Sequence, residues 1–292
     1  MNSLPRTIRC LAPSPARIAC LLILFSAQAN ADLLSARQAM EDQAHPLLLL
    51  SSARGAIYLE LFPEEAPLNV NNFLNLVDGN IESFEGVENS GFTLGYYDGA
   101  DFHRVVPGFL IQAGSPHLHP LGMPNEYLAD EINANALGLD RLPVLSIDGT
   151  ANEILNVGNQ VEFGKRVLEP LYAEMNIDSV NELGEQQYDV ASALQSLTVM
   201  RLYEYEGYEY QNQFPTRGIT RGTLVLANDG PNRNGPEFFI PVVDAKWLNG
   251  RYTVIGKVVE GMEIADQIGQ APIDPGQAQG ASIGIYSIRR MN

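Results

Sequence analysis

Hydrophobic positions in the first half of the chain follow two different spacings. Residues 56–61, with the sequence AIYLEL, form a β-rich run that ends before Pro63. Between Ala66 and Val77 the apolar residues instead recur every three or four positions, as on one face of a helix. The pattern therefore predicts a strand, a turn and a helix, in this order.

The strand pattern returns at several later places. Residues 102–112 are typical of two short strands around a turn at Pro107-Gly108. Beyond residue 222 the chain has four further β-rich runs, at 223–227, 237–242, 252–258 and 284–289. A second helix is expected at 262–268. Many short strands with only two framework helices are typical of a mainly β fold, and we expect a closed antiparallel barrel of about eight strands capped by these helices.

Residues 142–216 have a different character. They are rich in Glu, Gln, Asn and Tyr, and they contain amphipathic stretches such as 167–175 and 190–203. We interpret them as a mostly helical insertion that interrupts a barrel domain spanning 55–290. Residues 32–54 form a lead-in whose four leucines, 47 to 50, fit either the end of a helix or an edge strand.

The first 31 residues have the features of a secretory signal peptide. Three arginines and no acidic residue accompany the apolar run 18–25, and small residues follow up to Ala31, where we expect cleavage. A buried helix or a membrane anchor is the alternative, but the run is too short to span a bilayer. Cys20 does not follow the apolar run, as a lipidated cysteine would. We expect an exported protein, located in the bacterial periplasm.

Removal of this leader changes the composition. Both cysteines, Cys10 and Cys20, lie within it, so the mature chain could form no disulfide and use no thiol nucleophile. Three positive charges and no negative ones leave with it, which takes the net charge from -17 to -20. So acidic a chain is unsuited to binding nucleic-acid phosphates or an anionic membrane surface. The acidic excess indicates a solvated surface or, alternatively, a preference for positively charged client chains.

Three segments carry the most specific signal. They are FHRVVPGFLIQ at 102–112, LANDGPNRNGPEFFI at 226–240 and WLNGRYTVIGKV at 247–258. In this order they resemble the signature blocks of the cyclophilin-type peptidyl-prolyl cis-trans isomerases. The resemblance covers about 55–141 and 217–290. It implies a cyclophilin-like barrel that isomerises the bond before proline in unfolded or loop segments of client proteins, with no cofactor.

The resemblance also implies roles for individual residues. Arg104 matches the catalytic arginine of the family. An apolar floor for the proline ring would consist of Phe109, Leu110, Phe239 and Leu248. The remaining substrate-binding positions are Gln112, Ala227, Asn228, Glu237, Trp247 and Tyr252. In this family a tryptophan at the position of Trp247 accompanies sensitivity to cyclosporin, which makes a cyclosporin-type ligand a candidate partner.

The chemistry that such a site must perform is simple. Rotation about the bond before proline has a barrier of about 18–20 kcal/mol, because it destroys amide resonance. The twisted proline nitrogen gains a lone pair, so a fixed cation that donates toward it favours the transition state over both planar forms. A guanidinium is always charged, and Arg104 could therefore supply this cation. Each 1.4 kcal/mol or so gained only in the transition state increases the rate about tenfold.

Two positions depart from the commonest pattern of the family. Glu237 stands where many members carry glutamine, and Tyr252 where many carry histidine. Glu237 could weaken the field of Arg104 or accept a hydrogen bond from a substrate amide. Tyr252 keeps an aromatic face and a donor but cannot become a cation. We expect both to alter substrate preference more than reaction type.

Other kinds of chemistry have weaker support. His117 and His119 alternate and could face one metal ion, but prolines flank them and no third ligand is evident, so we expect no metal site. A hydrolase is disfavoured because no GxSxG elbow accompanies His103. One different class stays open, namely a non-catalytic chaperone or partner-binding module that uses the helical segment. The complete set of arginine and aromatic residues favours the isomerase.

Overall fold

The computed structural model describes residues 32–81, 94–120, 122–124, 126–271 and 283–291. The expected signal peptide, 1–31, lies outside them. Within these ranges nine antiparallel strands form one sheet, in the order β3-β9-β1-β2-β8-β6-β7-β5-β4. Their bounds are β1 Leu47–Ser52, β2 Gly55–Leu61, β3 Asp101–Phe102, β4 Arg104–Val106, β5 Leu110–Ala113, β6 Thr223–Asn228, β7 Asn234–Pro241, β8 Val254–Glu260 and β9 Ile283–Arg290.

The sheet is a nearly closed barrel. Its first and last strands, β3 and β4, are consecutive in the chain with only His103 between them, so the two ends of the sheet come together there. The expected mainly β barrel is thus confirmed, with nine strands where about eight were predicted. The difference includes β1, which pairs with both β2 and β9. The leucine run from Leu47 is therefore neither a helix end nor an edge strand, and the barrel begins there rather than at Gly55.

The barrel interior is filled by apolar side chains from alternate strand positions. Ile111 and Phe238 are fully buried in this inner core. Two helices complete it, α2 at Pro67–Asp78 and α8 at Met262–Gly269, with Phe73 and Ile268 among their buried residues. Both predicted framework helices are confirmed. Burial of each such side chain stabilises the fold by about 1.5–3 kcal/mol.

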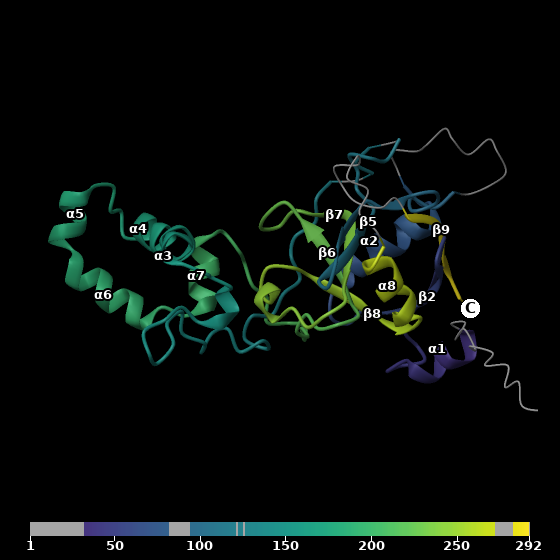
Figure 1. Cartoon of the computed structure of the whole chain (residues 1–292), viewed down its shortest axis with the longest axis horizontal. Coiled ribbons are helices and arrows are strands. Elements are labelled where there is room, and N and C mark those ends of the chain that lie inside the picture. The colour runs from purple at the N-terminus through teal and green to yellow at the C-terminus, as the bar shows by residue number, and fades with distance from the viewer. Residues whose placement is uncertain (1–31, 82–93, 121, 125, 272–282, 292) are drawn as a thin grey trace, which may run out of the picture.

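A group of helices lies at one end of the molecule, away from the barrel (Figure 1). We call residues 153–205 the helical arm. It comprises α3 Gln160–Phe163, α4 Glu169–Glu174, α5 Val180–Glu185, α6 Gln187–Ser196 and α7 Val199–Tyr205, with a 3-10 turn at Glu153–Leu155 and a π-helical turn at Gly164–Leu168. One apolar cluster of its own, around Leu171, holds it together, and a second cluster around Tyr203 joins it to residues 134–145 and 208–210. From residue 32 to residue 291, as far as the structure describes them, the helices lack the length and hydrophobicity needed to cross a bilayer.

The amphipathic stretch expected at 190–203 is divided between two helices. The chain leaves helical geometry between α6 and α7, where Thr198 has extended backbone angles. The Thr198 side chain accepts a hydrogen bond from the backbone N–H of Arg201. Threonine is favoured at such an N-cap because its oxygen satisfies a donor that the first helical turn leaves unpaired.

Gly250 marks the place where the root of the arm, by which we mean Tyr203 with the neighbouring residues Leu139 and Tyr210, approaches the barrel closely. A Cβ atom on Gly250 would lie 2.5 Å from Cδ1 of Leu139 and 3.2 Å from the ring of Tyr203. The Tyr210 hydroxyl donates to the Gly250 carbonyl over 2.9 Å. Because Gly250 closely follows the 3-10 turn Lys246–Leu248, the arm packs against the loop that carries Trp247 and Leu248.

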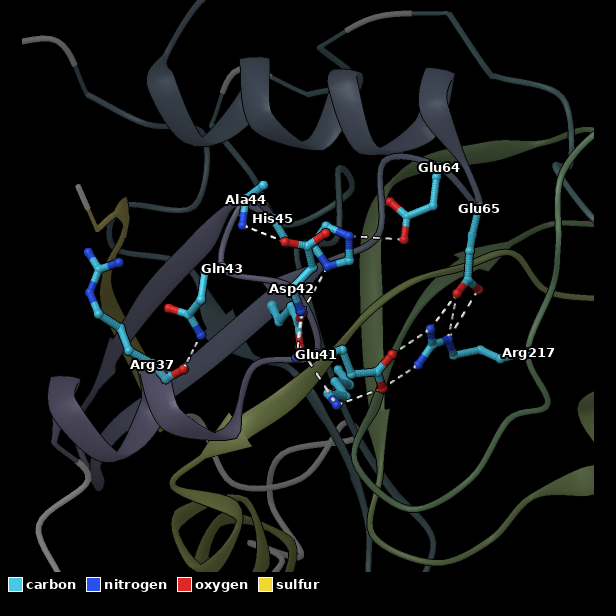
Figure 2. Close-up of polar contacts among 11 residues, drawn as sticks. Arg37, Glu41, Asp42, Gln43, Ala44, His45, Glu64, Glu65 and Arg217 are labelled. Carbon is cyan, nitrogen blue, oxygen red and sulfur yellow. Dashed lines mark hydrogen bonds and ion pairs between the residues drawn. The ribbon is translucent and has the colours of Figure 1, made fainter.

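Helix α1, Leu33–Ala39, and the residues after it are fixed to the outside of the barrel by polar contacts (Figure 2). The fully buried Glu60 accepts hydrogen bonds from the backbone of Glu41 and Asp42 and contacts His45 Nδ1 at 2.8 Å. The Glu41 carboxylate accepts from Arg217 Nη1 at 2.9 Å and from Lys257 Nζ at 2.7 Å. These contacts join the N-terminal segment to β2, to β8 and to the chain that returns from the arm.

The pairing of Glu41 predicts a pH-dependent contribution to stability. Hydrogen bonds from Arg217 and Lys257 lower the pKa of Glu41 to about 2. A carboxyl whose pKa is lowered in the folded state stabilises it above the unfolded pKa, and this stabilisation is lost as the pH falls toward 2. Because the side chain is 47% exposed, we expect at most about 1 kcal/mol. Urea unfolding should show Glu41→Gln less stable than the wild type at pH 6 and equal to it near pH 2.

The control is Glu209→Gln. Glu209 is exposed and forms no ion pair within the described ranges, so this variant should match the wild type at both pH values. A loss of stability in Glu41→Gln that is the same at pH 6 and pH 2 would contradict the electrostatic explanation.

Candidate functional site

The register of neighbouring strands places several predicted site residues in one row. Arg104 of β4 lies opposite Gln112 of β5, and Gln112 lies opposite Phe239 of β7. The row continues through Val225 of β6 to Val254 of β8. Directly opposed residues in antiparallel strands share a face, and successive residues alternate between faces. Because Ile111 and Phe238, the neighbours of Gln112 and Phe239, point into the inner core, this row lies on the outer face of the barrel.

A second apolar group covers this face, and we call it the outer cluster. Its buried members are Leu110, Ile219, Val225, Phe239, Ala245, Leu248 and Val254, and its half-buried members are Val106, Phe109, Ala227, Trp247 and Tyr252. It brings together all four residues predicted for the apolar floor, and three of the other predicted positions. The buried members Val225 and Val254 were missed, because alternate apolar positions on a strand do not reveal which face carries a site, and Ile219 and Ala245 were missed because they lie outside the strands.

The outer cluster has buried residues below and aromatic rings toward solvent. Leu110 and Phe239 are each only 3% exposed. The Phe109 and Trp247 rings lie 5.6 Å apart, and Tyr252 stands edge-on to Phe239 at the same centroid distance. These separations fall in the favourable range for aromatic pairs. The rings are therefore held by one another, while their outward faces stay available for contact.

Phe109 reaches this position through a tight turn. The predicted turn at Pro107-Gly108 is present, and the Phe109 N–H donates to the Val106 carbonyl over 3.0 Å. Gly108 has a φ of +70°, which a type II turn requires at its third position and which glycine adopts without strain. Proline before it has a backbone angle suited to the second position. The sequence of the turn thus fixes the direction in which Phe109 leaves β4.

A line of hydrogen bonds crosses the outer face beside the outer cluster. The exposed Arg104 donates from Nη1 to Oε1 of Gln112 over 2.8 Å, and Nε2 of Gln112 donates to Oε1 of Glu237, also over 2.8 Å. His103 Nε2 approaches the same Glu237 oxygen at 2.6 Å. Arg104, Gln112 and Glu237, predicted separately, therefore form one connected group. The negative charge of Glu237 also acts on Tyr96, because it adds to the rise in the pKa of Tyr96 that burial causes.

Asn228 lies at the end of β6, but its side chain already has partners within the chain. Its Nδ2 donates to the Arg251 carbonyl over 2.8 Å, and its Oδ1 accepts from the Gly230 N–H at 3.3 Å. A substrate that bonded the Asn228 amide would have to replace one of these contacts. The side chain therefore stabilises the turn that follows β6.

A shallow hollow that is open to solvent adjoins the line of hydrogen bonds. Three predicted residues line it, Ala227, Asn228 and Glu237. The others were not predicted from sequence and are Pro116, His117, Met123, Tyr127, Asp229, Arg233, Gly235 and Pro236. Asp229, Arg233, Gly235 and Pro236 lie inside the second signature block and could have been noticed there. Met123 and Tyr127 lie in a stretch whose sequence shows no periodic pattern.

The histidines considered as metal ligands are placed differently from one another. His119 stacks on Tyr96 with ring centroids 4.1 Å apart, and burial lowers its pKa. His117 instead lines the hollow. In the described part of the chain, no group of three or more His, Cys, Asp or Glu side chains is arranged to hold a metal ion.

Comparison with known proteins agrees with this geometry. Residues 47–290 match the family model described as "Cyclophilin type peptidyl-prolyl cis-trans isomerase/CLD". This match spans most of the chain, and it includes all nine strands and the row from Arg104 to Val254. The chain therefore belongs to the cyclophilin-type peptidyl-prolyl cis-trans isomerase family, as the three sequence blocks predicted.

Individual relatives are distant. "Peptidyl-prolyl cis-trans isomerase B" of Streptomyces anulatus is 25% identical over 229 residues, which covers 77% of this chain and 85% of that protein. "Peptidyl-prolyl cis-trans isomerase-like 1" of Rhizopus delemar is 24% identical over 227 residues, covering 78% and 82%. A solved Cryptosporidium parvum cyclophilin-type isomerase aligns with a TM-score of 0.47 and 21% identity, covering 85% of this chain and 99% of that one.

Proposed function

We propose that Arg104 catalyses prolyl isomerisation over the outer cluster. The observation that carries this proposal is the row in which the exposed Arg104, anchored by Gln112, lies two strands away from the buried Phe239. Neighbouring strands are about 4.8 Å apart, so the two backbones are separated by about 10 Å. One X-Pro unit can therefore place its ring on the outer cluster while the guanidinium reaches its peptide bond.

The proposed mechanism uses binding alone. The proline ring packs against Phe109, Leu110, Phe239 and Leu248. One of the five N–H donors of Arg104 is used by Gln112, and the others, which have no partner in the described part of the chain, are available to the proline nitrogen as it loses planarity. This donation is stronger to the twisted amide than to either planar form, so it lowers the barrier.

The substrate is proposed to be an extended or loop segment of an unfolded client protein. With proline on the outer cluster, neighbouring residues extend past Glu237 and Ala227 toward the hollow that these two residues line. The excess of acidic residues would favour client segments with positive charge. A cyclosporin-type ligand is proposed to occupy the same surface beside Trp247, where the indole offers an apolar face and one donor.

The mechanism predicts a selective loss of rate in Arg104→Ala. We expect isomerisation of a short prolyl peptide, and proline-limited refolding of a test protein, to slow by at least about tenfold, because the donor to the twisted nitrogen is removed. Peptide binding should change little. It can be followed separately through the fluorescence of Trp247, the single tryptophan of the chain.

Arg104→Lys serves as the matched variant. It keeps the positive charge but loses the planar fork, so an intermediate rate is expected. Equal rates for Arg104→Ala and the wild type would contradict the assignment of Arg104.

We further propose that the protein is exported and works in the bacterial periplasm. The support is the sequence of residues 1–31, with its arginines, its apolar run and its small residues before Asp32. Expression of the full chain in a Gram-negative host should yield a periplasmic protein that begins at Asp32, measured by fractionation and intact mass. Recovery of the uncleaved chain in the cytoplasm would contradict export.

A second candidate function is client holding by the helical arm. Three apolar side chains of the arm are largely exposed, namely Val161 (70%), Val180 (85%) and Tyr188 (82%). Single exposed apolar residues are common, but several on one arm could together contact an unfolded client. Replacement of Val180 and Tyr188 by serine should then weaken suppression of client aggregation about twofold or more while peptide isomerisation stays unchanged. Unchanged suppression would exclude this role for the arm, and Leu68→Ser on α2, 65% exposed, is the control.

A further inference from the structure

Arg104 and Glu237, the two hydrogen-bond partners of the Gln112 side chain, determine the orientation of its amide group. The Arg104 guanidinium can only donate hydrogen bonds, and an ionised carboxylate such as Glu237 can only accept them. Gln112 lies between them, with contacts of 2.8 Å on each side. Its oxygen must therefore face Arg104 and its nitrogen must face Glu237. The reverse orientation would set two donors against each other at Arg104 and two acceptors against each other at Glu237.

From this arrangement we infer that Glu237 is a positioning residue that acts on Arg104 through Gln112. The inference rests on the proposed function, because it concerns how the catalytic guanidinium is held. Arg104 is exposed, and Gln112 is its one hydrogen-bond acceptor among the side chains that the structure describes. Anything that stops Gln112 from turning therefore restricts the guanidinium as well.

His103 holds the carboxylate from the other side. Its Nε2 lies 2.6 Å from the same Glu237 oxygen that accepts from Gln112, so Nε2 carries the proton. Nδ1 of His103 is buried and has no partner among the described residues, which leaves Glu237 as the side chain that orients this ring. Because His103 joins β3 to β4, Glu237 is tied to the place where the barrel nearly closes.

Oε1 of Glu237 thus accepts hydrogen bonds from both Gln112 and His103. This arrangement predicts which substitutions of Glu237 are tolerated. Glutamine at 237 can place its amide oxygen where Oε1 now lies and accept from both Gln112 and His103. Methionine has similar length and shape but offers no comparable acceptor. Gln112 would then be held by Arg104 alone, so the two side chains could move together, and the guanidinium would lose its fixed position.

The test is a double-mutant cycle on isomerisation of a short prolyl peptide by the full chain. We expect Glu237→Met to lower kcat about tenfold, or about 1.4 kcal/mol, with KM changed less than twofold. Glu237→Gln should retain at least half of the wild-type kcat. In a Gln112→Ala background, Glu237→Met should have less than a twofold effect, since its route to Arg104 is gone.

Several outcomes would overturn the inference. Effects of Glu237→Met and Gln112→Ala that multiply would show that Glu237 acts without Gln112. A change confined to KM would indicate a direct substrate contact instead.

Thermal unfolding checks that each variant is folded, and Glu237→Ala replaces Glu237→Met in the cycle if the latter does not fold. If Arg104→Ala is inactive while Glu237→Met keeps the full rate, only this inference fails. If Arg104→Ala keeps the full rate, the proposed function fails as well.

Discussion

The register of five neighbouring strands is the constraint on which the site depends. It places Arg104, Gln112, Phe239, Val225 and Val254 in one row on the outer face. A shift of one residue in any of these strands would exchange outer and inner side chains, because successive residues point to opposite faces. The register is fixed by the inner core, which buries the alternate residues of the same strands. The packing that stabilises the barrel therefore also aligns the cation with the apolar surface.

Both faces of this part of the sheet are apolar, and a loop of the chain covers part of the outer face. The loop that carries Trp247 and Leu248 closes over the outer cluster, and the root of the helical arm packs against the same loop at Gly250. Glycine favours this approach, since its φ is +85° and a Cβ atom there would meet Leu139 and Tyr203. The arm is thus in structural contact with the site although its distal helices lie far from it (Figure 1).

Much of the fold could be predicted from local patterns. Both framework helices, the turn at Pro107-Gly108 and most strands follow from spacing and turn residues, because these features depend on neighbours in the sequence. The leucine run that forms β1 stayed open between a helix end and an edge strand, since four leucines are compatible with several structures until the partners β2 and β9 are known. The division of the helix at Thr198 depends on a cap that outweighs the amphipathic pattern.

The site was predictable to a similar extent. The three sequence blocks identified the floor residues of the outer cluster, three of its other members and the polar residues Arg104, Gln112 and Glu237, and the family match supports the same reaction class. Their connections were not predictable, because the line from Arg104 to His103 passes through Glu237 of β7, which is far in sequence from β4 and β5. Glu237 could be recognised only as a departure from the family pattern. Its role follows from donors and acceptors that the fold brings together.

The most direct measurement of the central claim is two-dimensional exchange NMR on a short Ala-Pro peptide with a small fraction of the protein. The account predicts cis-trans cross-peaks at mixing times of about a second, where the unaided reaction takes tens of seconds. It also predicts that the Trp247 indole N–H and the Gln112 amide shift on titration with the peptide. Absence of catalysed exchange, or shifts confined to the helical arm, would contradict it.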